Sequence, residues 1–203
     1  MESTAQPSDW RARKKAATRQ TIQEHALRLF LEKGFDATTV EEIATAAGVS
    51  HMTFFRYFKT KEEAAASDDY DELIAHLVAA RPAGEPVLEK LRQAFAAAFA
   101  QIYAADRAEL LTRTRLILGT PALRGKLWDN QATTQQYIVS VLAEAGGRSE
   151  QDLGLQTVVA AGLAAAATAV RIWAENEDTV ELPDLVDLAF AALGAGLPAG
   201  PAV

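Results

Sequence analysis

The sequence of 203 residues contains no cysteine, which excludes disulfide scaffolds, thiol nucleophiles and cysteine-ligated metal sites. Glycine and proline are sparse, with 12 and 7 residues, and they fall between periodic apolar segments rather than inside them. No sustained alternation of polar and apolar residues indicates a strand. These absences predict an all-α protein.

The first residues of the sequence do not resemble a secretory signal, and no apolar run reaches the length of a membrane span. Residues 1–15 are polar and then basic, with no apolar segment behind them. The longest apolar-looking run, Val158 to Val170, is mostly Ala and Gly, and is shorter than the roughly 20 residues that a membrane span needs. We expect a cytoplasmic protein that is not attached to a membrane.

Positive charge is scarce overall, because the net charge is −7. DNA-binding proteins usually carry a basic face, so the distribution of the charge matters. Residues 1–64 hold ten Lys and Arg against nine Asp and Glu, whereas the remaining 139 residues hold ten against eighteen. Within residues 10–33, seven basic side chains face two acidic ones. The beginning of the chain therefore has a cationic edge, and the acidity belongs to the rest.

Helical periodicity and stop signals predict the organisation of the chain. A first helix is expected over about 13–33, followed by Gly34, and capping boxes at Thr39 and Thr60 begin two more helices. Longer helices are then expected over residues 64–80, 86–103, 106–118, 121–145, 151–175 and 183–193. We expect three parts: a flexible N-terminal arm (1–12), a three-helix head with a helix-turn-helix (13–64), and a helical-bundle body of about six helices (65–203).

Residues 39–58, TVEEIATAAGVSHMTFFRYF, have the pattern of a helix-turn-helix. Such a motif needs a small residue where its helices cross and a glycine where the backbone turns, and Ala44 and Gly48 supply both. Ser50 is a suitable N-cap for the second helix. Ala-x-x-x-Gly alone would more often belong to an ordinary helical hairpin, but here several separate signals agree. The side chains expected to fill the space between the helices are Leu29, Phe30, Ile43, Val49, Phe54 and Phe58.

A wider set of residues within 13–63 carries a family resemblance: Gly34-Phe35, Thr38-Thr39-Val40, Ile43-Ala44, Ala47-Gly48-Val49-Ser50, Thr53 to Phe58 and Lys61-Glu62. Together they resemble the DNA-binding head of the TetR family of bacterial regulators. The resemblance implies an effector pocket in the body, a homodimer built by the last two helices, and most often a repressor released from a palindromic operator by a small effector. The later segment LILGTPALRGKLWD is similar to an actinobacterial branch that includes the mycofactocin-system regulator, which implies an acyl-thioester or other hydrophobic effector.

The resemblance also implies which side chains contact double-stranded DNA. His51 is the sharpest candidate for reading a base, although a histidine there could equally face solvent between contacts. Phe55 stands where many members carry tyrosine, so we expect it to pack on a sugar or a thymine methyl. The basic leader Arg11 to Lys15 is either an arm that reaches the DNA or a solubilising tail. The implied base-facing residues are Ser50, His51, Met52 and Thr53, and the implied phosphate contacts are Thr38 or Thr39, Tyr57 and Lys61.

In the body, the sequence offers candidates for an effector pocket and a dimer interface. A stripe of aromatics at helical spacing is more often ordinary core, and the last two helices could also simply complete a monomeric core. The candidate pocket residues are Phe95, Phe99, Tyr103, Arg113, Leu116, Trp128, Gln131, Thr134 and Tyr137. The candidate dimer residues are Leu155, Val159, Gly162, Leu163, Ala166, Val170, Leu185, Leu188, Ala189 and Leu193.

Other classes of function are weighed against a DNA-binding regulator. His25, His51 and His76 are scattered without metal-ligand spacing, and no phosphate-binding glycine loop occurs. We therefore expect no enzyme, no metal and no cofactor. A transcription activator of the same fold, or a helical small-molecule-binding protein without DNA, stays open as an alternative.

Overall fold

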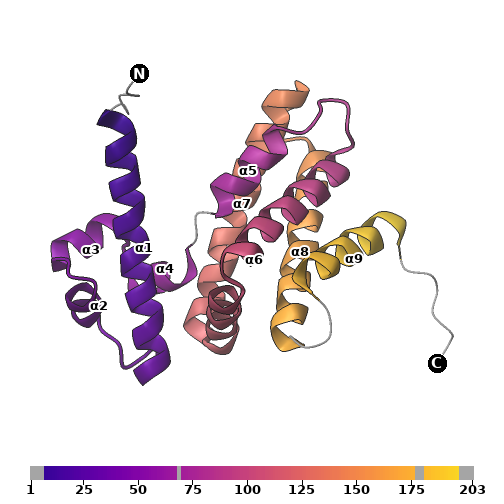
Figure 1. Ribbon diagram of the computed structural model, residues 1–203. Helices are drawn as coiled ribbons and strands as arrows, with labels where there is room; N and C mark the ends of the chain where they lie inside the picture. The colour runs from indigo at the N-terminus through magenta and orange to yellow at the C-terminus, as the bar shows by residue number, and fades with distance from the viewer. Residues whose placement is uncertain (1–6, 68–69, 177–180, 197–203) are drawn as a thin grey trace, which may run out of the picture. The chain divides into compact units, whose positions relative to one another are not determined.

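The computed structural model describes residues 7–67, 70–176 and 181–196, and these residues form helices and no strand (Figure 1). The all-α prediction is therefore confirmed. The helices are α1 (Pro7–Lys33), α2 (Val40–Ala46), α3 (His51–Tyr57), α4 (Lys61–Ala66), α5 (Tyr70–Ala79), α6 (Val87–Gly119), α7 (Pro121–Gly146), α8 (Leu153–Glu175) and α9 (Leu182–Ala195).

The chain divides into two compact units. The first, which we call the head, runs to Ser67 and also includes Thr120–Lys126 at the start of α7. The second, the body, comprises the remainder. The boundary lies close to the expected residue 64, but the first turns of α7 belong to the head, where Leu123 is fully buried. Apolar periodicity alone does not indicate which core a helix end joins.

In the head, α2, α3 and α4 are arranged around the long helix α1 (Figure 1). The apolar side of α1 supplies Ile22, Ala26 and Phe30 to the core, and each is buried. Ile43, Phe54 and Phe58 close the core from the other helices and are equally buried. Most of the apolar side chains expected between these helices are thus confirmed, while Leu29 and Val49 are only half-buried.

Several helix boundaries differ from the expectation. Helix α1 begins at Pro7, so residues 7–12 continue the helix instead of forming a flexible arm; proline suits a first helical position because its missing N–H would have no partner there. The expected helix 64–80 is two helices, because α4 ends at Ala66 and is capped by Ser67, whose hydroxyl donates to the carbonyl oxygen of Glu63. The break expected near residue 105 is a kink inside α6, where Asp106 has non-helical dihedrals and its carboxylate accepts from the Glu109 amide.

The body is built around the close approach of α8 to α6 and α9. A Cβ atom on Gly162 of α8 would lie 2.9 Å from Leu91 Cδ1 of α6 and 3.4 Å from Phe190 Cε1 of α9. Only glycine therefore lets these three helices meet at this distance without a shift of the neighbours. Around this contact lies one apolar core that also contains Phe95, Phe99 and Trp173.

Among the described residues, α8 is long and apolar enough to cross a membrane by length and composition, although no more than that supports a span. A helix that packs on both sides in a water-soluble protein passes the same test. Leu155, Val159 and Ala166 of α8 are buried in the body core, which explains one apolar side of the helix.

Candidate nucleic-acid interface

Helix α3 is held at its start by a side-chain cap and at its middle by the core. The hydroxyl oxygen of Ser50 accepts from the Thr53 amide at 3.1 Å, which satisfies one of the free amides of the first turn. Gly48 adopts φ 65° in the preceding turn, and the Val49 amide donates to the Ala44 carbonyl at 2.9 Å. Phe54 is fully buried beneath the helix. The turn therefore fixes both the position and the rotation of α3.

The opposite side of α3 is exposed and partly apolar. Met52 is 78% exposed and Phe55 is 42% exposed, which is unusual for such large side chains in a small helix. The rings of His51 and Phe55 meet edge to face with centroids 4.7 Å apart. A surface that combines apolar groups, hydroxyls and an imidazole on one helix suits base edges and thymine methyl groups in a major groove.

A carboxylate from the neighbouring helix orients His51. Glu41 Oε1 of α2 lies 3.1 Å from His51 Nε2, and both side chains are well exposed. When the Nε2 hydrogen points at this carboxylate, the neutral ring presents Nδ1 as an acceptor. Sequence reasoning did not single out Glu41, because an acidic residue on a DNA-facing surface contradicts the expected basic character.

The start of α2 forms the expected capping box. The Glu42 amide donates to Thr39 Oγ1 at 3.2 Å, and the Thr39 amide donates to Glu42 Oε2 at 2.8 Å. Lys33 pairs with the same carboxylate, and its hydrogen bond, followed by that of the Thr39 amide, lowers the pKa of Glu42 below its ordinary value. The exposed Thr39 hydroxyl accepts in this cap, so its hydrogen is left to donate to a phosphate.

Thr38 cannot make the phosphate contact that was predicted for Thr38 or Thr39. Its side chain is 1% exposed, and its hydroxyl donates to the Gly34 carbonyl oxygen at 2.8 Å. The phosphate contact therefore stays a prediction for Thr39 alone. Thr38 instead fastens the loop between α1 and α2 to the end of α1.

Lys61 has a structural task in the same loop. Its ammonium donates to the carbonyl oxygens of Phe35 at 2.7 Å, Thr38 at 3.0 Å and Asp36 at 3.3 Å, and it lies 4.4 Å from the centre of the Phe35 ring. An ammonium has three hydrogens, so these contacts use its full donor capacity. The phosphate contact expected of Lys61 stays a prediction, since a phosphate would have to compete with three carbonyls.

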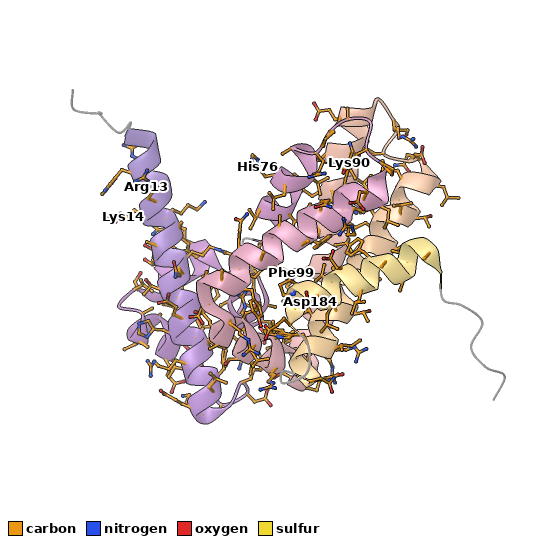
Figure 2. All side chains as sticks on the ribbon, turned by 45° about the vertical axis from the view of Figure 1, so that its right-hand side comes forward. Arg13, Lys14, His76, Lys90, Phe99 and Asp184 are labelled. Atoms are coloured by element: carbon orange, nitrogen blue, oxygen red, sulfur yellow. The ribbon has the colours of Figure 1, made fainter. Side chains whose placement is uncertain are left out.

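The N-terminal turns of α1 provide the expected cationic edge. Arg13 and Lys14 project from this part of the helix (Figure 2), and both are exposed. The ammonium of Lys14 lies 5.2 Å from the centre of the Trp10 ring. These charges sit on a helix, so any contact they make with DNA comes from a rigid element. Such a contact stays a prediction.

Comparison with known proteins decides the family. Residues 22–65 match the family model described as bacterial regulatory proteins, tetR family, and residues 85–198, more than half of the chain, match the MftR C-terminal domain. This chain belongs to the TetR family. It is 31% identical over 188 residues to a protein named as mycofactocin biosynthesis transcriptional regulator MftR of Mycobacterium tuberculosis, covering 91% of this chain and 93% of that protein. It is also 31% identical over 185 residues to the transcriptional regulator TcmR of Streptomyces glaucescens, covering 87% and 82%.

Solved structures of TetR-family proteins share the fold. The repressor FadR of Thermus thermophilus, in complex with lauroyl-CoA, is 25% identical with a TM-score of 0.50, covering 91% of this chain and 97% of that one. SmeT in complex with triclosan is 17% identical with a TM-score of 0.57, covering 87% and 91%, and shows the fold alone. The chain is therefore a DNA-binding transcriptional regulator, and its relatives are regulators rather than enzymes. In the part of the chain that the structure describes, no group of three metal-ligating side chains occurs.

The residues expected to line the effector pocket lie in the body but in different surroundings. Phe95, Phe99 and Thr134 are buried, whereas Tyr137 is exposed. Tyr103, Arg113, Leu116 and Gln131 are half-buried, and the side chain of Trp128 lies outside the described residues.

An open groove of about 470 Å³ between α6 and α9 is lined by other residues, including Leu88, Arg92 and Phe190. Within it, Arg92 binds Asp187 at 2.5 Å and also Glu89, whose pKa falls to about 2 through hydrogen bonds from Arg92 and Gln93.

The prediction that one face of α8 lies in the dimer interface needs correction. Leu155, Val159, Gly162, Leu163 and Ala166 are buried in the core of the same chain, so they cannot contact a second copy. An apolar stripe shows that a helix side is buried but does not show against which chain. Of the remaining candidates, Leu188 and Leu193 are exposed, and Val170, Leu185 and Ala189 are half-buried.

We predict that Lys61→Ala weakens operator binding by loosening the head, because three carbonyl contacts of the loop before α2 are lost. The unfolding free energy should fall by about 2 kcal/mol, as for hydrogen bonds to a charged group. Thermal unfolding and operator titrations at several salt concentrations measure both effects. Lys59→Ala, an exposed lysine near α3, should leave the unfolding temperature unchanged. An unchanged unfolding temperature with a salt slope reduced by about 0.9 would instead assign Lys61 to a phosphate.

We predict that Glu41→Gln raises affinity for all duplexes and reduces discrimination at one base pair of each half-site. Removal of the carboxylate ends repulsion from phosphates and frees the His51 ring to turn. Discrimination should fall by about 1–3 kcal/mol, the usual contribution of one good base contact. Affinities for the best operator and for its single-base variants measure this change, with Glu24→Gln on α1 as the control. If His51→Ala and Glu41→Gln lower discrimination additively in the double variant, the two side chains act separately and the proposed orientation is wrong.

Proposed function

We propose that this TetR-family regulator is a repressor that binds a palindromic operator as a homodimer and leaves it when a hydrophobic acyl effector binds the body. The observation that carries the DNA-binding half is the exposed side of α3, with Met52 and Phe55 uncovered above the buried Phe54. Large apolar groups on a capped helix need a partner surface. Regulators of this family bind DNA operators and small-molecule ligands as dimers, which supports the proposal.

The homodimer is proposed from the exposed sides of the last two helices. Leu188 of α9 is 61% exposed and Leu193 is 40% exposed. On α8, the small residues Thr157, Ala164 and Thr168 are exposed at helical spacing, on the side away from the buried Val159. Small side chains allow two copies of α8 to approach closely, and a two-fold axis pairs each helix with its copy.

DNA recognition itself favours two copies. Helix α3 has seven residues and reaches only a few base pairs. Two heads on a two-fold axis read both halves of a palindrome and multiply the specificity. The distance between the two α3 helices then decides whether both reach the major groove.

The effector class is proposed from similarity and chemistry together. The FadR repressor of Thermus thermophilus, 25% identical to this chain, was solved with lauroyl-CoA. The body of this chain offers an apolar core rich in large side chains, which suits an acyl tail. An effector that binds better to a dimer with wrongly spaced heads draws the population away from the operator, and the operator weakens effector binding by the same factor.

We predict that Leu188→Glu converts the dimer to monomers, because a buried carboxylate at the two-fold interface lacks a partner. Sedimentation at micromolar concentration should show the monomer mass, and operator affinity should fall at least tenfold. Circular dichroism should be unchanged, since the side chain is already exposed in the single chain. Leu31→Glu, at a similarly exposed leucine on α1, should leave the mass unchanged. A dimer of the Leu188→Glu variant at all concentrations contradicts the assigned interface.

We predict that micromolar lauroyl-CoA releases the protein from a fluorescent duplex carrying the sequence that it protects upstream of its own gene. Fluorescence anisotropy follows the release, and coenzyme A alone should have no effect because it lacks the acyl tail. The proposed induction fails if calorimetry shows that lauroyl-CoA is bound while the operator affinity stays the same.

A further inference from the structure

One buried polar atom of the body has no partner. Trp173, near the end of α8, is fully buried, and its indole Nε1 is the buried side-chain nitrogen without a hydrogen bond among the described residues. Buried donors are almost always paired, because an unpaired N–H loses its bonds to water without replacement. The position of this donor therefore calls for an acceptor that the described residues do not supply.

Polar groups of α6 gather around this tryptophan. The Tyr103 ring lies 5.7 Å from the Trp173 ring, and the Arg107 guanidinium lies 5.9 Å from it. Arg107 Nε donates to the Tyr103 hydroxyl at 2.6 Å, so the two side chains are joined beside Trp173. We call this pair the Tyr103–Arg107 cover. Arg115 Nε donates to the Ala174 carbonyl at 2.9 Å, which brings a second guanidinium to the same end of α8.

The cover is built across a break in its own helix. Asp106 has φ −159° and ψ 88°, so α6 is interrupted between Tyr103 and Arg107. A helix that is broken at this point lets the segments on its two sides move apart with little loss of backbone bonding. Arg107 is 36% exposed, and Glu181 lies 3.9 Å from its Nε, so one side of the cover meets solvent.

We propose that Trp173 Nε1 is the donor that recognises the effector, and that it donates to the carbonyl oxygen of an acyl thioester when the Tyr103–Arg107 cover opens. This assignment rests on the proposed function and specifies its ligand contact. Indole is a donor only, so the ligand atom must be an acceptor. The apolar core shared by Trp173, Phe99 and Leu163 receives the acyl chain, and the two guanidinium groups favour the phosphates of a coenzyme A head group.

The test compares ligands that differ at one atom. Lauroyl-CoA carries the thioester carbonyl, whereas the thioether S-dodecyl-CoA has the same chain and head group without it. Calorimetry with the full-length protein should show lauroyl-CoA binding about tenfold more tightly than the thioether. The Trp173→Phe variant, which keeps an aromatic ring and loses the donor, should bind the two ligands equally. Laurate has the same alkyl chain and an acceptor oxygen but no coenzyme A. We expect it to bind more weakly than lauroyl-CoA because it lacks the phosphates.

A second measurement needs no change at Trp173. In protein labelled with ¹⁵N in its indole rings, with Trp10 and Trp128 replaced by Phe, the remaining Nε1–H signal should move downfield with lauroyl-CoA and stay in place with the thioether. Equal affinities of the unaltered protein for both ligands, an unmoved signal, or no binding of lauroyl-CoA would each overturn the assignment. If lauroyl-CoA binds through Trp173 yet leaves the operator bound, the contact stands and the proposed induction fails.

Discussion

A helix of seven residues is not stable in water by itself, because the cost of its first turn is not recovered over so short a length. The conformation of α3 therefore depends on its surroundings. Ser50 caps its first turn, Phe54 anchors its underside in the core, and Gly48 sets the angle at which the chain enters it. The loop before α2 is also held in place, because the Lys61 ammonium donates to three of its carbonyl oxygens. The head holds one short helix with its outer side uncovered.

The charges of the head and of the body differ, as their functions do. Residues 65–203 carry ten Lys and Arg against eighteen Asp and Glu, whereas residues 1–64 carry ten against nine, so the acidic total is no obstacle to DNA binding. Within the head, acidic groups have local functions: Glu42 closes a capping box and pairs with Lys33, and Glu41 faces His51. Attraction to phosphates is left to the exposed basic groups of α1 and to helix starts such as Thr39. In the body, charged groups of α6 lie beside Trp173, where an effector with an anionic head group could meet them.

Much of the fold was predictable from the sequence because its signals are local. The capping box at Thr39, the hydroxyl cap at Thr60, the glycine of the turn and the apolar periodicity of α1 each lie within a few residues, and the structure confirms them. The second capping box is incomplete, because the Glu63 carboxylate accepts from the Lys59 amide and not from that of Thr60. Features that depend on distant contacts were not predictable. The capping-box spacing marks Thr39 as an N-cap, but nothing in the spacing shows that its neighbour Thr38 is buried, or that Lys61 reaches the carbonyl of Phe35. The apolar side of α8 was recognisable, but whether it packs within one chain or against a second copy depends on the fold of the whole body. Trp173 was recognisable as an aromatic near the end of its helix, whereas its unpaired nitrogen appears only in three dimensions.

We propose that two copies of α3, each held by its own head, read a two-fold DNA site. Selection of bound duplexes from a random pool by the full-length protein tests it most directly. The enriched sequences should form a palindrome whose half-sites are centred about one helical turn, roughly 34 Å, or a multiple of it apart. Enrichment of a single asymmetric half-site, or of no sequence at all, would contradict this reading of the structure.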